Sequence, residues 1–318
     1  MSTRSPLRSG WSRPPKLGPG DLAAVVATSS PVPRQPLQSG VAEMARWGLR
    51  VRLRSDIGER DGAFAGTRVR RLREWMEAWN DSEARAVWAA RGGAGAIEML
   101  PEAGLHLPAD RRLVFCGYSD LTYLHAVLQR RRMVTFYGPM VSFELARGDN
   151  VEGGYDGSLL RRLLFTGEPG GPVSGPQVAT LRGGVAEGRL TGGCLSLLST
   201  LVGTPNALDT DDAVLFLEDE KEPPHRVHRY LHHLRLAGAF SNVRAVVLGQ
   251  FPECEPGTAG GPSAWEVARA FFADFPGPVL WGLPIGHTKA PLVTLPYGVW
   301  ARLDGDAGVL DLLEPAVA

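Results

Sequence analysis

Short apolar runs alternate with amphipathic segments through the first part of the chain. The segments 22–30, 84–95 and 112–131 each start with a short apolar run. Small or polar residues follow each run, as they often follow buried parallel strands. Residues 37–48 and 69–81 carry apolar side chains at helical spacing. Strands that alternate with helices predict a parallel sheet with right-handed crossovers. The expected fold class is therefore α/β.

Glycine and proline become frequent in residues 146–178, around one short helical segment, which is typical of a crossing between domains. A second series of strands and helices begins at residue 179 and ends in a hairpin with an Asp-Gly turn. We therefore predict two α/β domains. In chain order we expect a disordered arm (1–18), an N-terminal domain (19–145), a linker (146–178) and a C-terminal domain (179–318).

The composition excludes several classes of function. Lys plus Arg and Asp plus Glu both total 34, so no charge excess points to nucleic acid or an anionic membrane as a partner. No apolar run reaches the length of a membrane span, and the polar N-terminal segment lacks the apolar core of a signal peptide. The three cysteines form no C-x-x-C pair, which argues against a disulfide framework or a zinc knuckle. We expect a cytoplasmic protein without a cofactor.

One predicted strand runs directly into the sequence Gly-Tyr-Ser-Asp-Leu at residues 117–121. Ligands of open α/β sheets bind beyond the carboxyl ends of the strands, so Ser119 is a candidate nucleophile. The amide of Asp120 would then point at a developing oxyanion. The turn is not a G-x-S-x-G elbow, because Leu121 stands where the second glycine would be. Ser and Asp are also common helix caps, so the turn alone leaves both interpretations open.

The glycine-rich segment 89–95 follows another predicted strand. It matches neither the phosphate-binding loop nor a full G-x-G-x-x-G motif, so a plain turn between strand and helix is the simpler interpretation. Its backbone amides could still provide a second donor to an oxyanion.

Two further polar groups emerge from strand ends in the second half of the chain. Glu218 ends an otherwise apolar run, and His287 lies in a loop bounded by glycine and proline directly after a strand. Each on its own is explained as a surface residue. Together with Ser119 they form the set of nucleophile, base and base-orienting acid that acyl transfer needs.

Four histidines follow Glu218 within a predicted helix. The spacing of His225, His228 and His232 places them on one helix face, where they could bind a metal ion. Ligands spread over several turns are poorly focused on one ion, and the segment is strongly basic. A solvated helix face is the simpler interpretation for these three and for His233, so we expect no metal site.

Six motifs together resemble those of the LD-carboxypeptidase family, which contains the muramoyl-tetrapeptide carboxypeptidases and the microcin C immunity peptidases. They are RGGAG, FCGYSDLTYLHAVL, GRLTGGCLSLLSTLVGTP, LFLEDEKEPPHRVHRYLHHL, VVLGQF and GLPIGHTKAPLVTLPYG. The resemblance runs in order from residue 17 to the end of the chain. It implies two α/β domains, the first like class I glutamine amidotransferases and the second an LD-carboxypeptidase C-terminal domain. It also implies an active site between them and, in many members, a homodimer.

The resemblance implies a serine peptidase in which Ser119 is the nucleophile, Glu218 the acid and His287 the base. The implied oxyanion donors are the amide of Asp120 and one amide from Gly92 or Gly93. No member of this triad is altered in the chain.

Five other positions depart from the pattern of the family. Ala94 replaces an aromatic residue, Cys194 replaces an asparagine, and Ala290 stands where an asparagine often follows the histidine. His225 and His228 replace a tyrosine and an aspartate. These substitutions bear on the substrate more than on the type of reaction.

The expected activity is that of a serine carboxypeptidase acting on an L,D-peptide bond, with release of terminal D-alanine from murein tetrapeptide in peptidoglycan recycling. The substrate carboxylate needs a cation, for which Arg91 and Arg226 are candidates. One alternative is an immunity-type peptidase that cleaves peptidyl- or aminoacyl-nucleotide conjugates, for which Trp281 or Trp300 would offer a stacking surface. Another is an inactive binding module.

Overall fold

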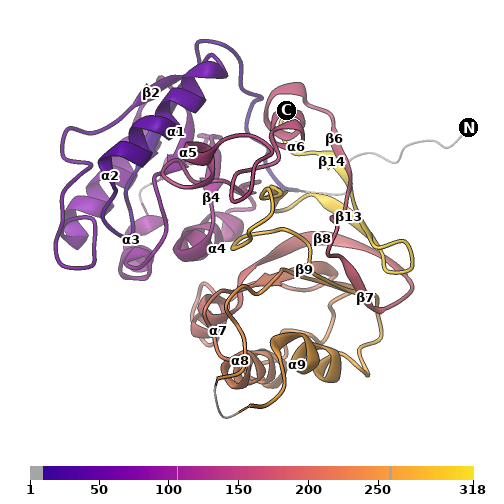
Figure 1. Cartoon of the computed structure of the whole chain (residues 1–318). Helices are drawn as coiled ribbons and strands as arrows, with labels where there is room; N and C mark the ends of the chain where they lie inside the picture. Colours follow the sequence, from indigo (N-terminus) through magenta and orange to yellow (C-terminus); the bar gives the residue numbers. More distant parts are fainter. Residues whose placement is uncertain (1–9, 106, 258–259) are drawn as a thin grey trace, which may run out of the picture.

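The structure is a computed structural model that describes residues 10–105, 107–257 and 260–318. Its described residues form two α/β units, each built on its own sheet (Figure 1). The prediction of an α/β fold with two domains is confirmed, whereas the likeness of the first domain to glutamine amidotransferases stays a prediction. None of the described helices is long and apolar enough to cross a membrane.

The first sheet has the strand order β12-β5-β4-β3-β1-β2. Five of its strands are parallel, as the alternation of strand and helix predicts, and β12 runs antiparallel to β5. The strands are β1 (Leu22–Val26), β2 (Arg50–Arg52), β3 (Ala84–Ala89), β4 (Val114–Gly117), β5 (Phe136–Tyr137) and β12 (Leu295–Pro296). The helices of this domain are α1 (Arg34–Arg46), α2 (Arg68–Asn80), η1 (Ala96–Met99), α3 (Leu100–Ala103), η2 (Ser119–Leu121) and α4 (Thr122–Arg130).

The second sheet has the order β6-β14-β13-β8-β9-β10-β11-β7, with a parallel centre from β8 to β11. The strands are β6 (Pro169–Val173), β7 (Ala179–Arg182), β8 (Val185–Cys194), β9 (Ala213–Glu218), β10 (Ala245–Leu248), β11 (Val279–Trp281), β13 (Trp300–Asp304) and β14 (Val309–Pro315). Helices α7 (Leu195–Leu201), α8 (Pro224–Leu236) and α9 (Ala264–Phe271) lie together on one face of this sheet (Figure 1). The predicted closing hairpin is the antiparallel pair β13–β14.

The sheets do not follow the predicted boundaries strictly. Strand β6, in the expected linker, pairs with β14 at the edge of the second sheet. Strand β12, from the C-terminal half, pairs with β5 in the first sheet. The linker also holds α5 (Glu144–Arg147), α6 (Gly157–Arg161) and a π-helical turn, η3 (Arg162–Thr166). The C-terminal half of the chain therefore contributes one strand to the first sheet, which connects the two domains.

The predicted disordered arm is only partly covered, because residues 1–9 lie outside the described residues. The expectation of disorder does not hold for residues 10–18. Leu17 is buried in the core, and Arg13 donates to Glu314 at 2.8 Å. Ser12 also forms a bridge with Met133. The segment is ordered because its backbone and its one large aliphatic side chain find partners in both halves of the chain.

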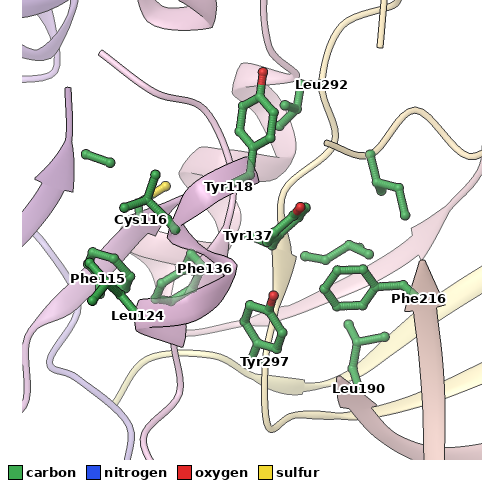
Figure 2. Packing of buried hydrophobic residues seen from close by; sticks show 14 of the residues in the cluster. Phe115, Cys116, Tyr118, Leu124, Phe136, Tyr137, Leu190, Phe216, Leu292 and Tyr297 are labelled. Atoms are coloured by element: carbon green, nitrogen blue, oxygen red, sulfur yellow. The ribbon is translucent and has the colours of Figure 1, made fainter. Parts of the chain in front are cut away.

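Buried aromatic side chains fill the space where the two domains meet. Figure 2 shows Tyr118, Tyr137 and Tyr297 close together, with Phe216 of β9 beside them. The ring centroids of Tyr137 and Phe216 are 5.2 Å apart, and those of Tyr137 and Tyr297 are 5.9 Å apart. This packing holds the end of β9 against the end of β5.

Candidate active site

Ser119 lies on a tight turn between β4 and α4. Its φ of 64° is in the left-handed region, which is unusual for a residue with a side chain. Such strain persists where the surroundings hold it in place, and it is common at functional sites. Here it turns the serine side chain out of the strand end and into a cleft. The candidate nucleophile is therefore accessible, as the position of the residue in the sequence predicts.

Glu218 is the fully buried last residue of β9. Its Oε2 accepts two hydrogen bonds from His287, one from the ring Nδ1 at 2.8 Å and one from the backbone amide at 2.9 Å. The residues are 69 positions apart in the chain, and the structure brings them together. Because a carboxylate only accepts, Nδ1 carries the hydrogen and Nε2 is left for proton transfer.

The charges around His287 favour its protonated form. Burial opposes protonation, but the Glu218 carboxylate outweighs it and, with Glu220 and Asp219, raises the pKa of His287 to about 9. Burial likewise opposes ionisation of Glu218, but the charge and hydrogen bonds of His287 and the hydroxyl of Tyr137 lower its pKa. Nε2 of His287 lies 3.3 Å from Glu220 Oε1. In the free protein the imidazole is thus held between two carboxylates.

Sequence reasoning did not identify two residues that position Glu218. Tyr137 donates its hydroxyl hydrogen to Glu218 Oε1 at 2.5 Å. Gly286 has a φ of 60°, and a Cβ added there would lie 2.3 Å from Glu218 Cδ, so only glycine fits. The glycine directly before His287 was a signal for this close approach, whereas nothing in the sequence pointed to Tyr137.

The glycine-rich loop after β3 lies against the nucleophile. A Cβ on Gly92 would lie 2.9 Å from Ser119 Cβ, so the close approach requires glycine. The carbonyl of Gly92 accepts from the Ser30 amide at 3.3 Å. In a trans peptide the amide of Gly93 points the opposite way. Asp120 is buried, and its carboxylate accepts from the amide of Ala96 at 2.9 Å, which ties the loop to the serine turn.

Ser119, His287 and the glycine-rich loop line a cleft of about 810 Å³ between the two domains. It contains charges of both signs. Its lining residues are Arg91, Gly92, Gly93, Tyr118, Ser119, Met140, Phe143, Glu144, Arg147, Glu152, Gly153, Glu220, Lys221, Pro252, Glu253, His287, Thr288 and Lys289.

The two candidate cations differ in their placement. Arg91 lines the cleft, half-buried, with its guanidinium 5.3 Å from the centre of the Phe143 ring and one nitrogen donating to Pro31 O at 2.9 Å. Arg226 does not belong to the lining. It is exposed on α8 and lies 3.5 Å from Glu222. The structure therefore places Arg91, and not Arg226, in the lining of the cleft.

The histidines of α8 are not gathered into a site. His225 and His228 face a separate hollow beside Pro223 and Pro262. The rings of His228 and His232 are 4.2 Å apart, and His233 Nδ1 lies 2.7 Å from Ser199 Oγ. In residues 10–105, 107–257 and 260–318 no group of three metal-binding side chains is close enough to hold an ion.

None of the positions that depart from the family pattern belongs to the described lining of the cleft, although Ala94 and Ala290 directly follow the lining residues Gly93 and Lys289. The amide of Ala94 donates to the Ser30 hydroxyl, and the amide of Ala290 donates to the Thr288 hydroxyl. Cys194 is buried beside Asp219. The two candidate stacking residues are also elsewhere. Trp281 stacks on Phe251, and Trp300 donates to Glu187.

The chain matches known proteins over most of its length. Residues 23–138 match the LD-carboxypeptidase N-terminal domain, and residues 187–303 match the C-terminal domain. A putative carboxypeptidase of Streptomyces coelicolor is 36% identical over 96% of this chain and 97% of that protein. This chain belongs to the LD-carboxypeptidase family. It is accordingly a serine-type carboxypeptidase.

Two other similar proteins are named for murein peptides, and a structural neighbour is named for microcin immunity. A probable murein peptide carboxypeptidase of Bacillus subtilis is 32% identical over 92% of this chain and 91% of that protein. A muramoyltetrapeptide carboxypeptidase structure from Oxalobacter formigenes is 29% identical, with a TM-score of 0.76, over 91% of this chain and 97% of that one. The microcin C7 self-immunity protein has the same fold, with a TM-score of 0.84 at 22% identity over 96% and 100% of the two chains.

Proposed function

We propose that Ser119, His287 and Glu218 form the catalytic triad of this carboxypeptidase. The observation that carries the proposal is the pair of hydrogen bonds from His287 to the buried carboxylate of Glu218, in a cleft that Ser119 also lines. A serine hydroxyl needs a neighbouring imidazole to take its proton, and a carboxylate on the other ring nitrogen orients that imidazole.

The proposed reaction has two steps. Nε2 of neutral His287 removes the hydroxyl proton of Ser119 as its oxygen attacks the scissile carbonyl, and the imidazolium then protonates the leaving amine. Water hydrolyses the acyl-enzyme by the same proton transfers in reverse order. The developing oxyanion is bound by the amide of Asp120 and, since the carbonyl of Gly92 is turned toward Ser30, by the amide of Gly93 rather than that of Gly92.

We propose an L,D-peptide bond as the target, with release of D-alanine from murein tetrapeptide in peptidoglycan recycling. Arg91 is the candidate for the terminal carboxylate, because a guanidinium recognises carboxylates with two parallel hydrogen bonds. The mixed charges of the lining suit a peptide that carries both ammonium and carboxylate groups. A cytoplasmic location and a homodimer remain predictions.

Product analysis by mass spectrometry on murein tetrapeptide tests this proposal. The wild type should release D-alanine, and Ser119→Ala should release none. Cleavage by neither protein would reject the murein substrate. Cleavage by both would reject Ser119 as the nucleophile.

An aminoacyl-sulfamoyl nucleoside provides the comparison substrate, because microcin C7 self-immunity structures contain such compounds. We expect murein tetrapeptide to be the better substrate, since Trp281 and Trp300 do not line the described cleft. Faster turnover of the nucleoside conjugate would instead favour the immunity-type activity.

A further inference from the structure

The hydroxyl of Tyr137 connects two parts of the proposed triad that come from different domains. It donates to Glu218 Oε1 at 2.5 Å, and it accepts from the backbone amide of Ser119 at 3.3 Å. Tyr137 ends β5, where it is the pairing partner of Gly117, two residues before Ser119. Glu218 is 81 positions away, at the end of β9. One oxygen atom therefore contacts both the turn of the nucleophile and the acid.

A tyrosine hydroxyl suits this position because it donates one hydrogen and accepts another. The two oxygens of Glu218 are then used separately, Oε2 by His287 and Oε1 by Tyr137. Tyr137 is fully buried. Burial, with the charge of Glu218, raises the pKa of Tyr137 well above its usual value, so the hydroxyl keeps its proton at any working pH.

We propose that Tyr137 is a positioning residue of the active site, which holds the Glu218 carboxylate and the Ser119 turn in register across the domain boundary. The proposal rests on the triad of the proposed function. Tyr137 does not belong to the described lining of the cleft, so it acts through Glu218 and Ser119 and not on the substrate.

Neighbouring tyrosines allow this role to be separated from packing. Tyr297 lies in the same aromatic cluster, 5.9 Å from Tyr137 between ring centroids, and donates to the carbonyl of Gly192 at 3.2 Å (Figure 2). It is also fully buried. Tyr297→Phe therefore removes a buried hydroxyl of the same kind without touching the hydrogen bonds of the triad.

The test measures how fast Ser119 reacts with a fluorophosphonate, which needs no knowledge of the natural substrate. The Ser119 oxygen bonds to phosphorus, fluoride leaves, and His287 takes the hydroxyl proton. We expect the maximal labelling rate of Tyr137→Phe to fall roughly 10- to 100-fold, the range for losing a hydrogen bond to a charged group. Tyr297→Phe should change it less than about twofold, and both variants should bind the probe with unchanged affinity.

The pH dependence of labelling gives a second readout that a packing defect would not move. Without the Tyr137 donor, Glu218 is a stronger base and holds the imidazolium of His287 more firmly. The acidic limb of the labelling profile should therefore move to higher pH in Tyr137→Phe. The other groups that act on His287, Glu220 and Asp219, are unchanged in this comparison, as is the Tyr118 ring, which packs edge-on against the imidazole.

If Tyr137→Phe does not fold, 3-fluorotyrosine at position 137 keeps the ring and makes the hydroxyl a stronger donor. The acidic limb should then move to lower pH. An unchanged rate and limb in whichever variant folds would overturn the role of Tyr137. Wild-type protein that is not labelled at Ser119 would instead reject the triad, and labelled protein that leaves murein tetrapeptide intact would reject only the proposed substrate.

Discussion

The loop after β11 and the helix α8 both carry histidine, but their imidazoles have different surroundings. His287 has a side chain that is 13% exposed, and two of its donors share one buried carboxylate oxygen. His225, His228 and His233 are exposed on α8, where Val227, Leu231 and Leu234 form the buried face.

These surroundings shift the pKa values of His287 and His232 in opposite directions. The surroundings of His287 raise its pKa to about 9. On α8, burial and the neighbouring His228 and Arg235 lower the pKa of His232. The carboxylates around His287 thus stabilise its protonated form, whereas the cationic neighbours of His232 on α8 disfavour protonation. The number of histidines in a segment says little about its chemistry.

The largest expected effect separates these two regions directly. His287→Ala should lower kcat/KM by about 10⁴-fold or more, as loss of the base does in triad hydrolases. The double variant His228→Ala/His232→Ala should change it less than about twofold. Steady-state kinetics of the two proteins, with circular dichroism to verify folding, makes the comparison. Losses of similar size would mean that α8 takes part in catalysis.

A smaller effect is expected from the glycine that lets His287 approach Glu218. Gly286→Ala adds a Cβ that would lie 2.3 Å from Glu218 Cδ, at a φ of 60°. We expect kcat to fall about 100-fold, as for a displacement of catalytic groups by about 1 Å, and the free energy of unfolding to fall by about 1–3 kcal/mol.

Gly308→Ala is the matched control for Gly286→Ala. Its φ is 68°, yet the nearest atom to an added Cβ is Val178 Cγ1 at 3.6 Å. Gly308→Ala should therefore lower the thermal stability only by the cost of backbone strain, and kcat should be unchanged. Equal kinetics for the two variants would show that contact with Glu218 is irrelevant.

The pH dependence of kcat/KM should reveal how the carboxylates around His287 raise its pKa. An imidazole whose pKa is raised to about 9 is protonated below that pH and cannot accept the serine proton, so kcat/KM should fall as the pH is lowered from about 9. Glu220→Gln removes the negative charge next to Nε2 and should move this limb to lower pH. At neutral pH kcat/KM should rise about two- to fivefold, the range for a partly exposed ion pair.

Glu253→Gln controls for the general loss of a negative charge in the cleft. Glu253 lines the cleft and lies 3.9 Å from Lys221. Removal of the Glu253 charge should leave the acidic limb of the kcat/KM profile in place. A limb that moves equally in both variants would assign the effect to the overall field of the cleft and not to the contact with Nε2.

The smallest expected effect is that of metal removal. Exhaustive chelation should change kcat/KM by less than about twofold, because no three metal-binding side chains gather in the described part of the chain and the proposed triad needs no metal ion. Activity lost on chelation and restored by added zinc would contradict both the triad and the view of α8 as a solvated face.

Much of the architecture could be predicted from the sequence, because the end of an apolar run marks the end of a buried strand. An apolar run that stops at Glu218, and another that runs into Gly-Tyr-Ser119, mark the edge of a sheet where ligands bind. Family motifs then suggest which polar residues belong together. The short segments β6 and β12 were not predicted, because each pairs with a strand distant in sequence and neither has a periodicity of its own.

The roles of Tyr137 and Glu220 were also out of reach of the sequence. Tyr137 stands in a short apolar strand like any core residue, and Glu220 is one of several acids in a row. Their importance depends on hydrogen bonds and charges between residues brought together by folding. Arg91 and Arg226 show the same limit, since only the structure places one in the cleft and the other in solvent.

The sequence by itself determined the α/β class, the family, the strand ends next to Ser119 and Glu218, and the glycine-bounded loop that carries His287, because periodicity and local motifs are properties of neighbouring residues. The tertiary structure alone decided which nitrogen of His287 contacts Glu218, how Tyr137 connects Glu218 to the Ser119 turn, and which of Arg91 and Arg226 lines the cleft. Those features are distances between residues far apart in the chain, and only the packing of the two sheets sets them.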